Sequence, residues 1–550
     1  MVTDVDWRCW TITVENVWGI APAGTALVVI KIQIIAFGAQ AMLEQGFPDW
    51  TELGQDSGLD PLGMQRPVEA IYQSLIPGIS TITLRFRYYS FFPFILRHYE
   101  TNIRNADPAV FRVYHRRCEA LYALICTHDV RELGVAGSDW AAKMLANSAV
   151  SEGQHGVVDF SQGADPEADE QFRYLRNKSG AFGAIYATQM QAMGLLHFPT
   201  KNAPNPNPVC AESALAVAEA FAHELSDLAP AFFKAVSEGR IAISSLALFE
   251  RMRPSRLRPG SSEHMLLTDI LLAKSGPRLE NDIMRGNTLR MLLAAAETEQ
   301  EIPHQETVKW HWYETAFSAS SPYLHGTPAL WFLYQACDLT RLAYEAILSA
   351  ALTTLASAPR GRMSLAALVG ELTRYADLPA DESWETFSTA QLAGSQTARE
   401  IATSMLDAVG EPEDQVRYAI QLMVVLCDAA QGSAELVEKA LSGADYFQSL
   451  RTETKYIEAA RSNPVRKVVA DLVLERVLKR HLWVASRKFR NQKAYTFHME
   501  PEDGVLRYRA DFRPAPSSPR IAQALAFLRD ASLISDKGVT QQGRLEMAVA

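Results

Sequence analysis

Apolar positions recur at spacings of three and four residues along most of the chain, a pattern that predicts amphipathic α-helices. The pattern is clearest over residues 117–126, 179–197, 211–228, 330–355, 415–430 and 465–490. Clusters of proline, glycine and asparagine separate these stretches, and the sequence shows no repeat of fixed period, which argues against a solenoid. We therefore expect a mainly α-helical, multidomain protein.

A proline-rich segment suggests where one domain ends and the next begins. The segment 201–208 (KNAPNPNP) holds three prolines and three asparagines, which exclude a helix or a central strand. At about 100–200 residues per domain, a chain of 550 residues holds roughly three. We expect an N-terminal helical domain over 42–205, a central helical domain over 206–445 and a basic C-terminal module over 446–550.

The first 41 residues form an apolar leader outside these domains. Its most apolar run, residues 23–39, is interrupted by Lys31 and Gln33 and is shorter than the ~20 residues that span a bilayer. Two interpretations stay open. The leader is either a buried strand or membrane-touching arm, or it precedes a natural start of translation at Met42. We favour the start at Met42, because turn-forming sequence begins there.

Composition narrows the class of protein. With 48% hydrophobic and 21% charged residues, the chain is too apolar for a disordered protein and too charged for a polytopic membrane protein. Its net charge of −10 excludes a uniformly basic nucleic-acid coat. The six cysteines form no C-x-x-C pair, so we expect reduced thiols in a cytoplasmic protein and no zinc site. These cysteines are Cys9, Cys118, Cys126, Cys210, Cys337 and Cys427.

The stretch 58–100 combines arginines with many aromatic residues. Turns near its start and at 77–78 bracket a short amphipathic helix, and Ser80 or Thr81 can cap a second helix. Arg85 and Arg87 lie between aromatic residues of that second helix, so they can stack on bases or bind phosphate as a secondary contact. We favour the alternative, an aromatic core helix whose two arginines form internal ion pairs.

Several motifs carry a family resemblance. They are GLDPLGM (58–64), PGISTITLRFRYYSF (77–91), CEALYALI (118–125), GVAGSDWA (134–141), HLWVASRKFR (481–490) and YTFHMEPEDG (495–504). Together they resemble a bacterial protein family of unassigned function, and the PGIST…RxRYY element is similar to a domain-of-unknown-function family associated with anti-phage defence clusters. The resemblance implies a chain start near Met42 and a role in defence, and it assigns no catalytic residue.

Positive charge is concentrated near the C-terminus. Residues 451–520 hold 16 Lys and Arg against 8 Asp and Glu. On a helical wheel, one apolar stripe of the helix over 465–490 comprises Ala470, Leu474, Leu478, Leu482, Ala485 and Phe489. The opposite face comprises Arg476, Lys479, Arg480, Trp483, Arg487 and Arg490.

No acid interrupts that basic face on the wheel, since Glu475 falls roughly 40° outside it. A solvated helix usually interleaves acids with bases to gain ion pairs. A face of five like charges repels itself unless a polyanion neutralises it, and Trp483 offers a stacking surface. The pattern favours a nucleic-acid backbone or an acidic protein surface as the partner.

The end of the chain predicts a small mixed module. Alternating residues on either side of the turn 501–504 predict a β-hairpin, with Arg507 and Arg509 on its return strand. Ser518 and Pro519 then predict the start of a helix. The tail 527–547 (FLRDASLISDKGVTQQGRLEM) resembles the end of winged-helix modules, some of which bind nucleic acid and others protein.

Catalytic signatures are weak. The sequence lacks G-x-x-x-x-G-K-[ST], G-x-G-x-x-G and G-x-S-x-G, so ATPase, Rossmann and hydrolase interpretations lose their main motifs. Two clusters nevertheless carry groups that could bind a metal ion. The first is His155, Asp159, Asp165 and Asp169, and the second is His304, Glu306, His311 and Glu314. We favour an acidic solvated loop for the first and surface or core-edge histidines for the second. His223-Glu224 lacks the second histidine that a metalloprotease needs. We expect no metal site and no cofactor.

These observations predict a non-catalytic nucleic-acid-binding or scaffolding subunit of a multi-protein bacterial system, with anti-phage defence as its setting. Its expected partners are nucleic acid and proteins of the same gene cluster, with no membrane. A divergent metal-dependent nuclease and a pure protein-assembly subunit stay open as alternatives.

Overall fold

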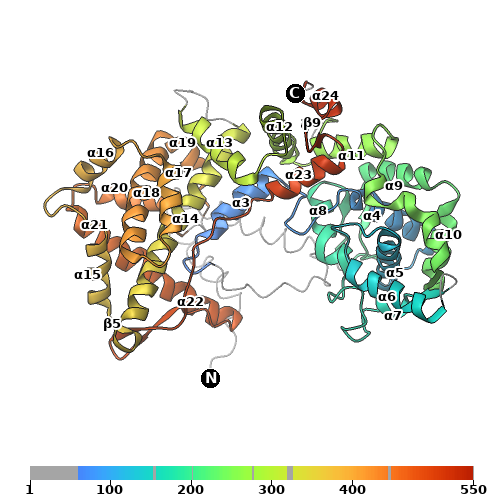
Figure 1. Cartoon of the computed structure of the whole chain (residues 1–550), viewed down its shortest axis with the longest axis horizontal. Coiled ribbons are helices and arrows are strands. Elements are labelled where there is room, and N and C mark those ends of the chain that lie inside the picture. The colour runs from blue at the N-terminus through green and yellow to red at the C-terminus, as the bar shows by residue number, and fades with distance from the viewer. Residues whose placement is uncertain are drawn as a thin grey trace, which may run out of the picture. The chain divides into compact units, whose positions relative to one another are not determined.

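Figure 1 shows the computed structural model of the chain, in which the described residues are 60–152, 156–200, 202–275, 278–318, 326–443 and 447–548. They are mainly helical, as the apolar spacing predicts. The chain divides into two compact units. Within the described residues, unit 1 comprises residues 87–266, and unit 2 comprises residues 60–86 and 267–548. The apolar leader over 1–41 lies outside the described residues.

Unit 1 consists of helices and two short antiparallel strand pairs, β1–β4 and β2–β3. Its elements are α4 (Tyr88–His98), a π-helix (Tyr99–Ile103), α5 (Pro108–Thr127), α6 (Ser138–Glu152), β1 (Val157–Asp159), α7 (Ser161–Ala164), a π-helix (Phe182–Tyr186), α8 (Ala187–Ala192), β2 (Leu196–His197), β3 (Val209–Cys210), α9 (Glu212–Leu225), α10 (Leu228–Glu238), β4 (Arg240–Ala242) and 3₁₀ turns at Ile243–Met252 and Pro254–Arg256. The boundary between the units falls within α11 (Ser262–Leu272).

Helix α4 carries the aromatic core of unit 1. Every residue from Tyr88 to Leu96 is buried. The ring of Phe91 stacks on Tyr122 of α5 with 4.1 Å between ring centroids, and Tyr88 stacks on Tyr186 at 4.5 Å. Stacked and edge-to-face rings add to the stabilisation that burial itself gives. The interpretation of this stretch as an aromatic core helix is therefore confirmed.

The start expected for that helix is wrong. Helix α4 begins at Tyr88, well after Ser80 and Thr81, and has no side-chain cap. The hydroxyl of Thr83 instead accepts a hydrogen bond from the Ser80 N–H at 2.8 Å and donates to the Ser80 carbonyl at 2.9 Å. These bonds stabilise a local turn, and such turns compete with helix initiation.

Unit 2 contains the remaining elements. They are α3 (Gln65–Leu75), α12 (Asp282–Glu299), α13 (Gln305–Ser318), α14 (Gly326–Ser357), a 3₁₀ turn (Pro359–Gly361), β5 (Arg362–Ser364), α15 (Leu365–Tyr375), α16 (Trp384–Leu392), α17 (Ala398–Asp407), α18 (Pro412–Gly432), α19 (Ala434–Ala440), α20 (Leu450–Ala459), α21 (Val465–Asp471), a π-helix (Leu472–Leu478), α22 (Lys479–Gln492), β6 (Met499–Glu502), β7 (Val505–Tyr508), α23 (Ile521–Asp530), β8 (Ile534–Ser535), β9 (Gly538–Val539) and α24 (Gln541–Ala548).

The long helix α14 lies at the centre of unit 2. It is buried along most of its length and packs against α3, α13 and α18. Figure 1 shows α14 running alongside α18, and α17 and α20 also pack on α18. Because α14 has neighbours on several sides, its sequence is apolar around most of the helix rather than along one stripe.

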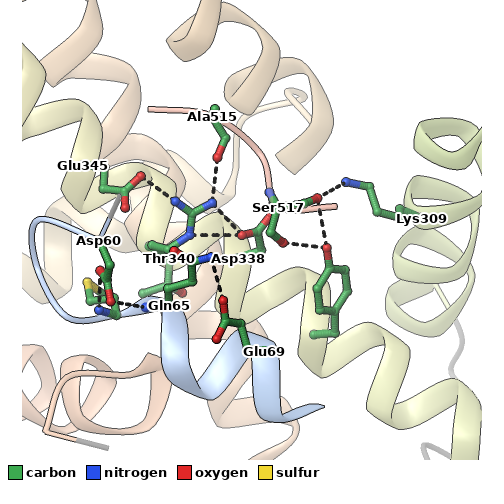
Figure 2. A network of polar contacts seen from close by, with 12 residues as sticks. Asp60, Gln65, Glu69, Lys309, Asp338, Thr340, Glu345, Ala515 and Ser517 are labelled. Atoms are coloured by element: carbon green, nitrogen blue, oxygen red, sulfur yellow. Dashed lines mark hydrogen bonds and ion pairs between the residues drawn. The ribbon is translucent and has the colours of Figure 1, made fainter. Parts of the chain in front are cut away.

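A buried polar network attaches the segment before α23 to α14 (Figure 2). The guanidinium of Arg341 donates to Asp338 at 2.8 Å, to Glu345 at 2.6 Å and to the Ala515 carbonyl at 2.7 Å. The other Asp338 oxygen accepts from the Ser517 N–H at 3.0 Å. Buried charges are tolerated when they are paired and hydrogen-bonded, so this network fixes the course of residues 515–517.

The expected hairpin near the C-terminus is present, with a third strand beside it. Strands β6 and β7 pair antiparallel around Asp503 and Gly504, both of which have positive φ. Strand β5 joins the other edge of β7, so the sheet order is β5-β7-β6. The hairpin is therefore built into the helical body of unit 2 through a strand that lies far away in the sequence.

Ser518 and Pro519 do not begin the next helix. Helix α23 begins at Ile521, after Arg520 at φ 67°. The side chain of Arg520 donates to the Ile79 carbonyl at 2.6 Å, and this contact fixes the turn into the helix. Helices α23 and α24 and strand β9 pack against α12. A winged-helix module is not confirmed.

The two units do not follow the expected domain boundaries. The position near residue 205 falls within unit 1, where β2 pairs with β3 across the proline-rich segment. The position near residue 445 falls within unit 2. Proline and asparagine mark a loop at 201–208, and a loop can lie inside a compact unit as well as between two.

Among the described residues, no single helix has the length and apolar composition needed to cross a bilayer; α18 and α19 meet those criteria only jointly, across a bend of 91°. The structure describes five cysteines as thiols, four of them buried and Cys210 half-buried.

Candidate nucleic-acid interface

The basic helix of the sequence analysis is continuous but changes its register. Residues 465–492 run through α21, the π-helix Leu472–Leu478 and α22. A π-helix winds more residues into each turn than an α-helix does, so side chains beyond it rotate away from the positions that a regular wheel assigns.

This rotation changes which residues are buried. Leu478 and Ala485 are buried as expected, whereas Phe489 is 50% exposed. Ala470, Leu474 and Leu482 are only partly buried. The buried stripe observed consists of Val465, Val468, Val469, Leu472, Val473, Val477, Leu478, His481, Val484 and Ala485. The single apolar stripe expected from the wheel is therefore wrong.

The basic face is also less free of acids than the wheel indicates. Arg476 forms a two-pronged ion pair with Glu453 of α20, whose side chain is only 2% exposed. Lys479 pairs with Glu475 one turn earlier at 2.6 Å. The expectation of an unpartnered basic face is wrong for these two residues. The wheel cannot show Glu453, which comes from another helix, and it does not show that the side chain of Glu475 reaches Lys479 one turn away.

The hairpin arginines are paired as well. Arg507 contacts Glu502 at 3.4 Å, and Arg509 pairs with Glu500 on the neighbouring strand. Both acids belong to β6, which pairs with β7 in the hairpin. The acids of one strand therefore neutralise the arginines of the hairpin.

Arg85 and Arg87, the secondary candidates, take the internal ion pairs that we favoured for them. Arg85 bonds to Asp530 at 3.0 Å within unit 2. Arg87 is buried in unit 1, where its guanidinium bonds to both oxygens of Glu263 at 2.9 and 2.7 Å.

Three residues of the basic helix do come together at a cleft. Arg480, Trp483 and Arg487 line a cavity of about 460 Å³ in unit 2, with Phe447 beside them. The Arg480 guanidinium lies 4.5 Å from the centre of the Trp483 ring, and that of Arg487 lies 5.4 Å from it. Neither arginine forms an ion pair with a described carboxylate. Arg490 is exposed on the next turn of α22.

The opposite wall of the cleft is the loop that leads into α3. Gly63 has φ 70°, and a Cβ at this position would lie 3.1 Å from the Arg480 guanidinium. The missing side chain therefore permits the arginine to approach the loop, where it donates to the Leu62 carbonyl at 2.9 Å. Lys488 donates to the Asp60 carbonyl at 3.0 Å.

Acids also line the cleft, and both have other partners. The Asp60 carboxylate accepts the N–H groups of Met64 and Gln65 at 2.9 and 3.1 Å, so it caps the start of α3. Glu69 accepts from the Gln65 side chain at 2.8 Å, and both contacts are drawn in Figure 2. Against these two acids stand four cations, Arg66, Arg480, Arg487 and Lys488.

The surroundings of Arg480 in the cleft disfavour the positive charge of its guanidinium. Burial and the neighbouring Arg476 cation lower the pKa of Arg480 to about 10. Arg487 repels it further. A partly buried cation near other cations is stabilised by any anion that enters, so the cleft has the character of an anion site.

Sequence reasoning missed Phe447, Lys488 and Gly63 as parts of this site. Phe447 and Gly63 lie outside the basic helix, and only the fold brings them to it. The one available signal was the Asp-Pro-Leu-Gly turn at 60–63, which marks a tight loop without showing what packs on it.

The possible metal clusters are not assembled among the described residues, where no group of three or more His, Cys, Asp or Glu side chains is placed to hold a metal ion. His304, His311 and Glu314 are exposed on or beside α13, and Glu306 pairs with Lys309 at 2.9 Å. His155 lies outside the described residues. Glu224, next to His223, pairs with Arg258 at 2.6 Å.

The chain matches no protein-family model, no curated protein and no solved structure, so any functional proposal rests on the arrangement of its own residues.

Proposed function

We propose that this chain is a nucleic-acid-binding subunit of a multi-protein bacterial system, as the family resemblance suggests for phage defence, and that its partners perform the chemistry. Arg480 and Arg487 contact the phosphate backbone in the cleft beside α22. Arg490 extends the basic surface along the same helix.

One observation carries the proposal. Two arginines lie against one tryptophan in a cleft, with no described carboxylate paired to either of them. Arginine and aromatic side chains together suit nucleic acid, because the guanidinium binds phosphate while the ring offers a surface for bases. The other arginines of the basic helix and hairpin that have ion pairs support the fold instead.

The test is binding of the full chain to labelled nucleic acid over a salt series from about 50 to about 300 mM. We expect the logarithm of the association constant to fall linearly with the logarithm of the salt concentration. The double variant Arg487→Gln/Arg490→Gln should lower that slope by about 1.5, since each phosphate contact contributes roughly 0.7–0.9. Arg476 is left unchanged, because its loss would strand the buried Glu453.

A matched control is Arg240→Gln. Arg240 is an exposed arginine on β4 of unit 1, far in sequence from the cleft. Its loss removes one positive charge, half the change in the double variant, and should leave the slope unchanged. If Arg240→Gln lowers the slope by about half as much as the double variant does, the interaction depends on net charge and not on this cleft.

Two other functions give different results in the same assay. A metal-dependent nuclease would cleave the labelled strand when Mg²⁺ or Mn²⁺ is added. A pure assembly subunit would bind no nucleic acid at any salt concentration and would copurify with an acidic protein. Either result contradicts the proposal.

A further inference from the structure

Large aromatic side chains are exposed around α22. Phe447, Trp483, Phe489 and Tyr495 have exposed fractions of 53, 43, 50 and 57%. Among the described Phe, Tyr and Trp side chains, the only other one that is exposed to a similar degree is Phe172. Exposed rings that gather in one region, rather than scatter singly over the surface, indicate a binding surface.

The rings form two groups along the helix. Phe447 and Trp483 lie 6.1 Å apart between ring centroids, next to the cleft. Tyr495 lies 6.5 Å from Phe489 and 5.4 Å from Phe497, beyond the end of α22. Phe489 follows Trp483 by six positions, which corresponds to about 9 Å along a helix axis. We call these two groups the aromatic track.

Cations accompany the aromatic track. Arg480 and Arg487 lie within 6 Å of rings in the first group. Arg490 and Lys493 are exposed and lie in sequence between Phe489 and Tyr495 of the second group. Rings and positive charges therefore alternate along the sequence of the track.

This alternation distinguishes between the forms of nucleic acid. In a duplex, each base face is covered by the next base pair, so a protein ring gains no stacking partner. An unpaired strand presents both its phosphates and its base faces, and proteins that bind such strands combine a basic groove with aromatic rings. Of the four arginines in Leu472–Gln492, three lack a described ion-pair partner, which is few for a protein that relies on duplex phosphates alone.

We propose that the ligand of this surface is single-stranded nucleic acid, with phosphates at Arg480 and Arg487 and bases stacked on Phe489 and Tyr495. The proposal rests on the proposed function and specifies its ligand. Trp483 is already covered in part by its arginines, so its part is to orient the two guanidiniums.

The first experiment measures how tightly the full chain binds each of three ligands of about 20 nucleotides. They are oligothymidylate, a strand of the same length with abasic sites and a duplex. The abasic strand keeps the phosphates and loses the base faces. We expect it to bind at least about fivefold more weakly than oligothymidylate, and the duplex to bind more weakly as well.

The second experiment removes the rings. Phe489→Ala and Tyr495→Ala should each weaken binding of oligothymidylate at least about fivefold and leave binding of the abasic strand unchanged. Tyr495→Phe keeps the ring and loses the hydroxyl that bonds to Glu500, so it should bind like the unaltered chain. Phe172→Ala removes an equally exposed ring from unit 1 and should have no effect.

The outcomes separate this inference from the proposed function. Equal affinity for oligothymidylate and the abasic strand, with a steep dependence on salt, would overturn base stacking and leave phosphate binding intact. A preference for the duplex would overturn it too. No binding of any of the three ligands would overturn the proposed function itself.

Discussion

At the scale of single residues, the role of each arginine in α21–α22 and the hairpin depends on whether an acid reaches it. Arg476 meets Glu453 from another helix, and Arg509 meets Glu500 from the paired strand. Arg480 and Arg487 meet no described carboxylate and lie against Trp483 instead. Residues of one type on one helix therefore divide into those that support the fold and those available for a ligand.

The pairing of Arg476 predicts a large loss of stability on its removal. Arg476→Met leaves the carboxylate of Glu453 buried without its partner, so we expect the free energy of unfolding to fall by about 3 kcal/mol. Lys479→Gln, one turn along the helix, breaks an exposed pair and should change it by less than about 0.5 kcal/mol. Urea unfolding measures both values.

The double variant Arg476→Met/Glu453→Met provides the control. Replacing both charges by apolar side chains removes the stranded carboxylate, so much of the lost stability should return. If Arg476→Met is as mild as Lys479→Gln, the pair does not hold α20 to the helix that follows it.

His481 gives the fold a dependence on pH. Its ring donates from Nδ1 to the Pro61 carbonyl at 3.2 Å and accepts the His498 N–H at Nε2 at 3.0 Å, so it is neutral in the folded chain. Burial and the neighbouring His498 lower its pKa to about 4, whereas an unfolded histidine titrates near 6.5.

The sign of the effect follows from these two values. Below pH 6.5 the unfolded chain binds a proton that folded His481 does not, so its contribution to stability is complete above that pH and is lost as the pH falls toward 4. Between pH 7 and pH 5 the loss is about 2 kcal/mol. His481→Gln should reduce the measured decrease in stability by about that amount, whereas His311→Gln, at an exposed site, should not.

At the scale of elements, the sequence predicts what depends on neighbours along the chain. Apolar spacing identified α5, α14 and α18, and alternation identified the β6–β7 hairpin. It did not reveal β5, since a strand of three residues that pairs with β7 across more than 140 positions leaves no local signal.

The same limit explains the candidate site. The positions of Arg480, Trp483 and Arg487 on one helix were predicted correctly from their spacing. The exposure of Phe489 was not predicted, because the π-helix Leu472–Leu478 rotates all the side chains that follow it. No recognised sequence pattern marks a π-helix, in which each hydrogen bond joins residues five positions apart. The acids that remove Arg476 and Lys479 from the site depend on packing and side-chain choice, which a wheel does not contain.

The C-terminal elements β8, β9 and α24 pack so closely that adding one methyl group, by a Gly-to-Ala substitution, tests their packing. A Cβ on Gly543 would lie 2.2 Å from the Leu533 carbonyl oxygen and 2.6 Å from the Val539 side chain. Alanine usually stabilises a helix relative to glycine, yet here we expect Gly543→Ala to destabilise these elements by about 1–3 kcal/mol. Hydrogen exchange of the amides in 533–548 measures the change.

Gly432, the last residue of α18, is the matched control. A Cβ there meets no atom within 4 Å, so Gly432→Ala should be neutral or stabilise by up to about 1 kcal/mol. Equal effects of the two substitutions would mean that α24 does not pack on the β8–β9 turn as described.

At the scale of the whole molecule, the segment after residue 446 depends on partners from earlier in the chain. Strand β7 pairs with β5, α23 and α24 pack on α12, and Arg341 and Asp338 of α14 hold residues 515–517. Helix α22 rests on the loop at 60–63 through Arg480 and Lys488. Unit 2 accordingly draws its core from two separated stretches of sequence, 60–86 and 267–548.

This arrangement predicts that residues 446–550 do not fold when produced alone, although their basic character and hairpin suggest a module. Without β5 and α14, the hairpin loses a strand and the segment 515–517 loses its polar anchor, and two strands without a covering body are only marginally stable. An amide proton–nitrogen correlation spectrum of the fragment should show the narrow dispersion of an unfolded chain. A dispersed spectrum with a cooperative thermal transition would instead establish an autonomous C-terminal domain, and the contacts to α12 and α14 would then be docking contacts rather than parts of one core.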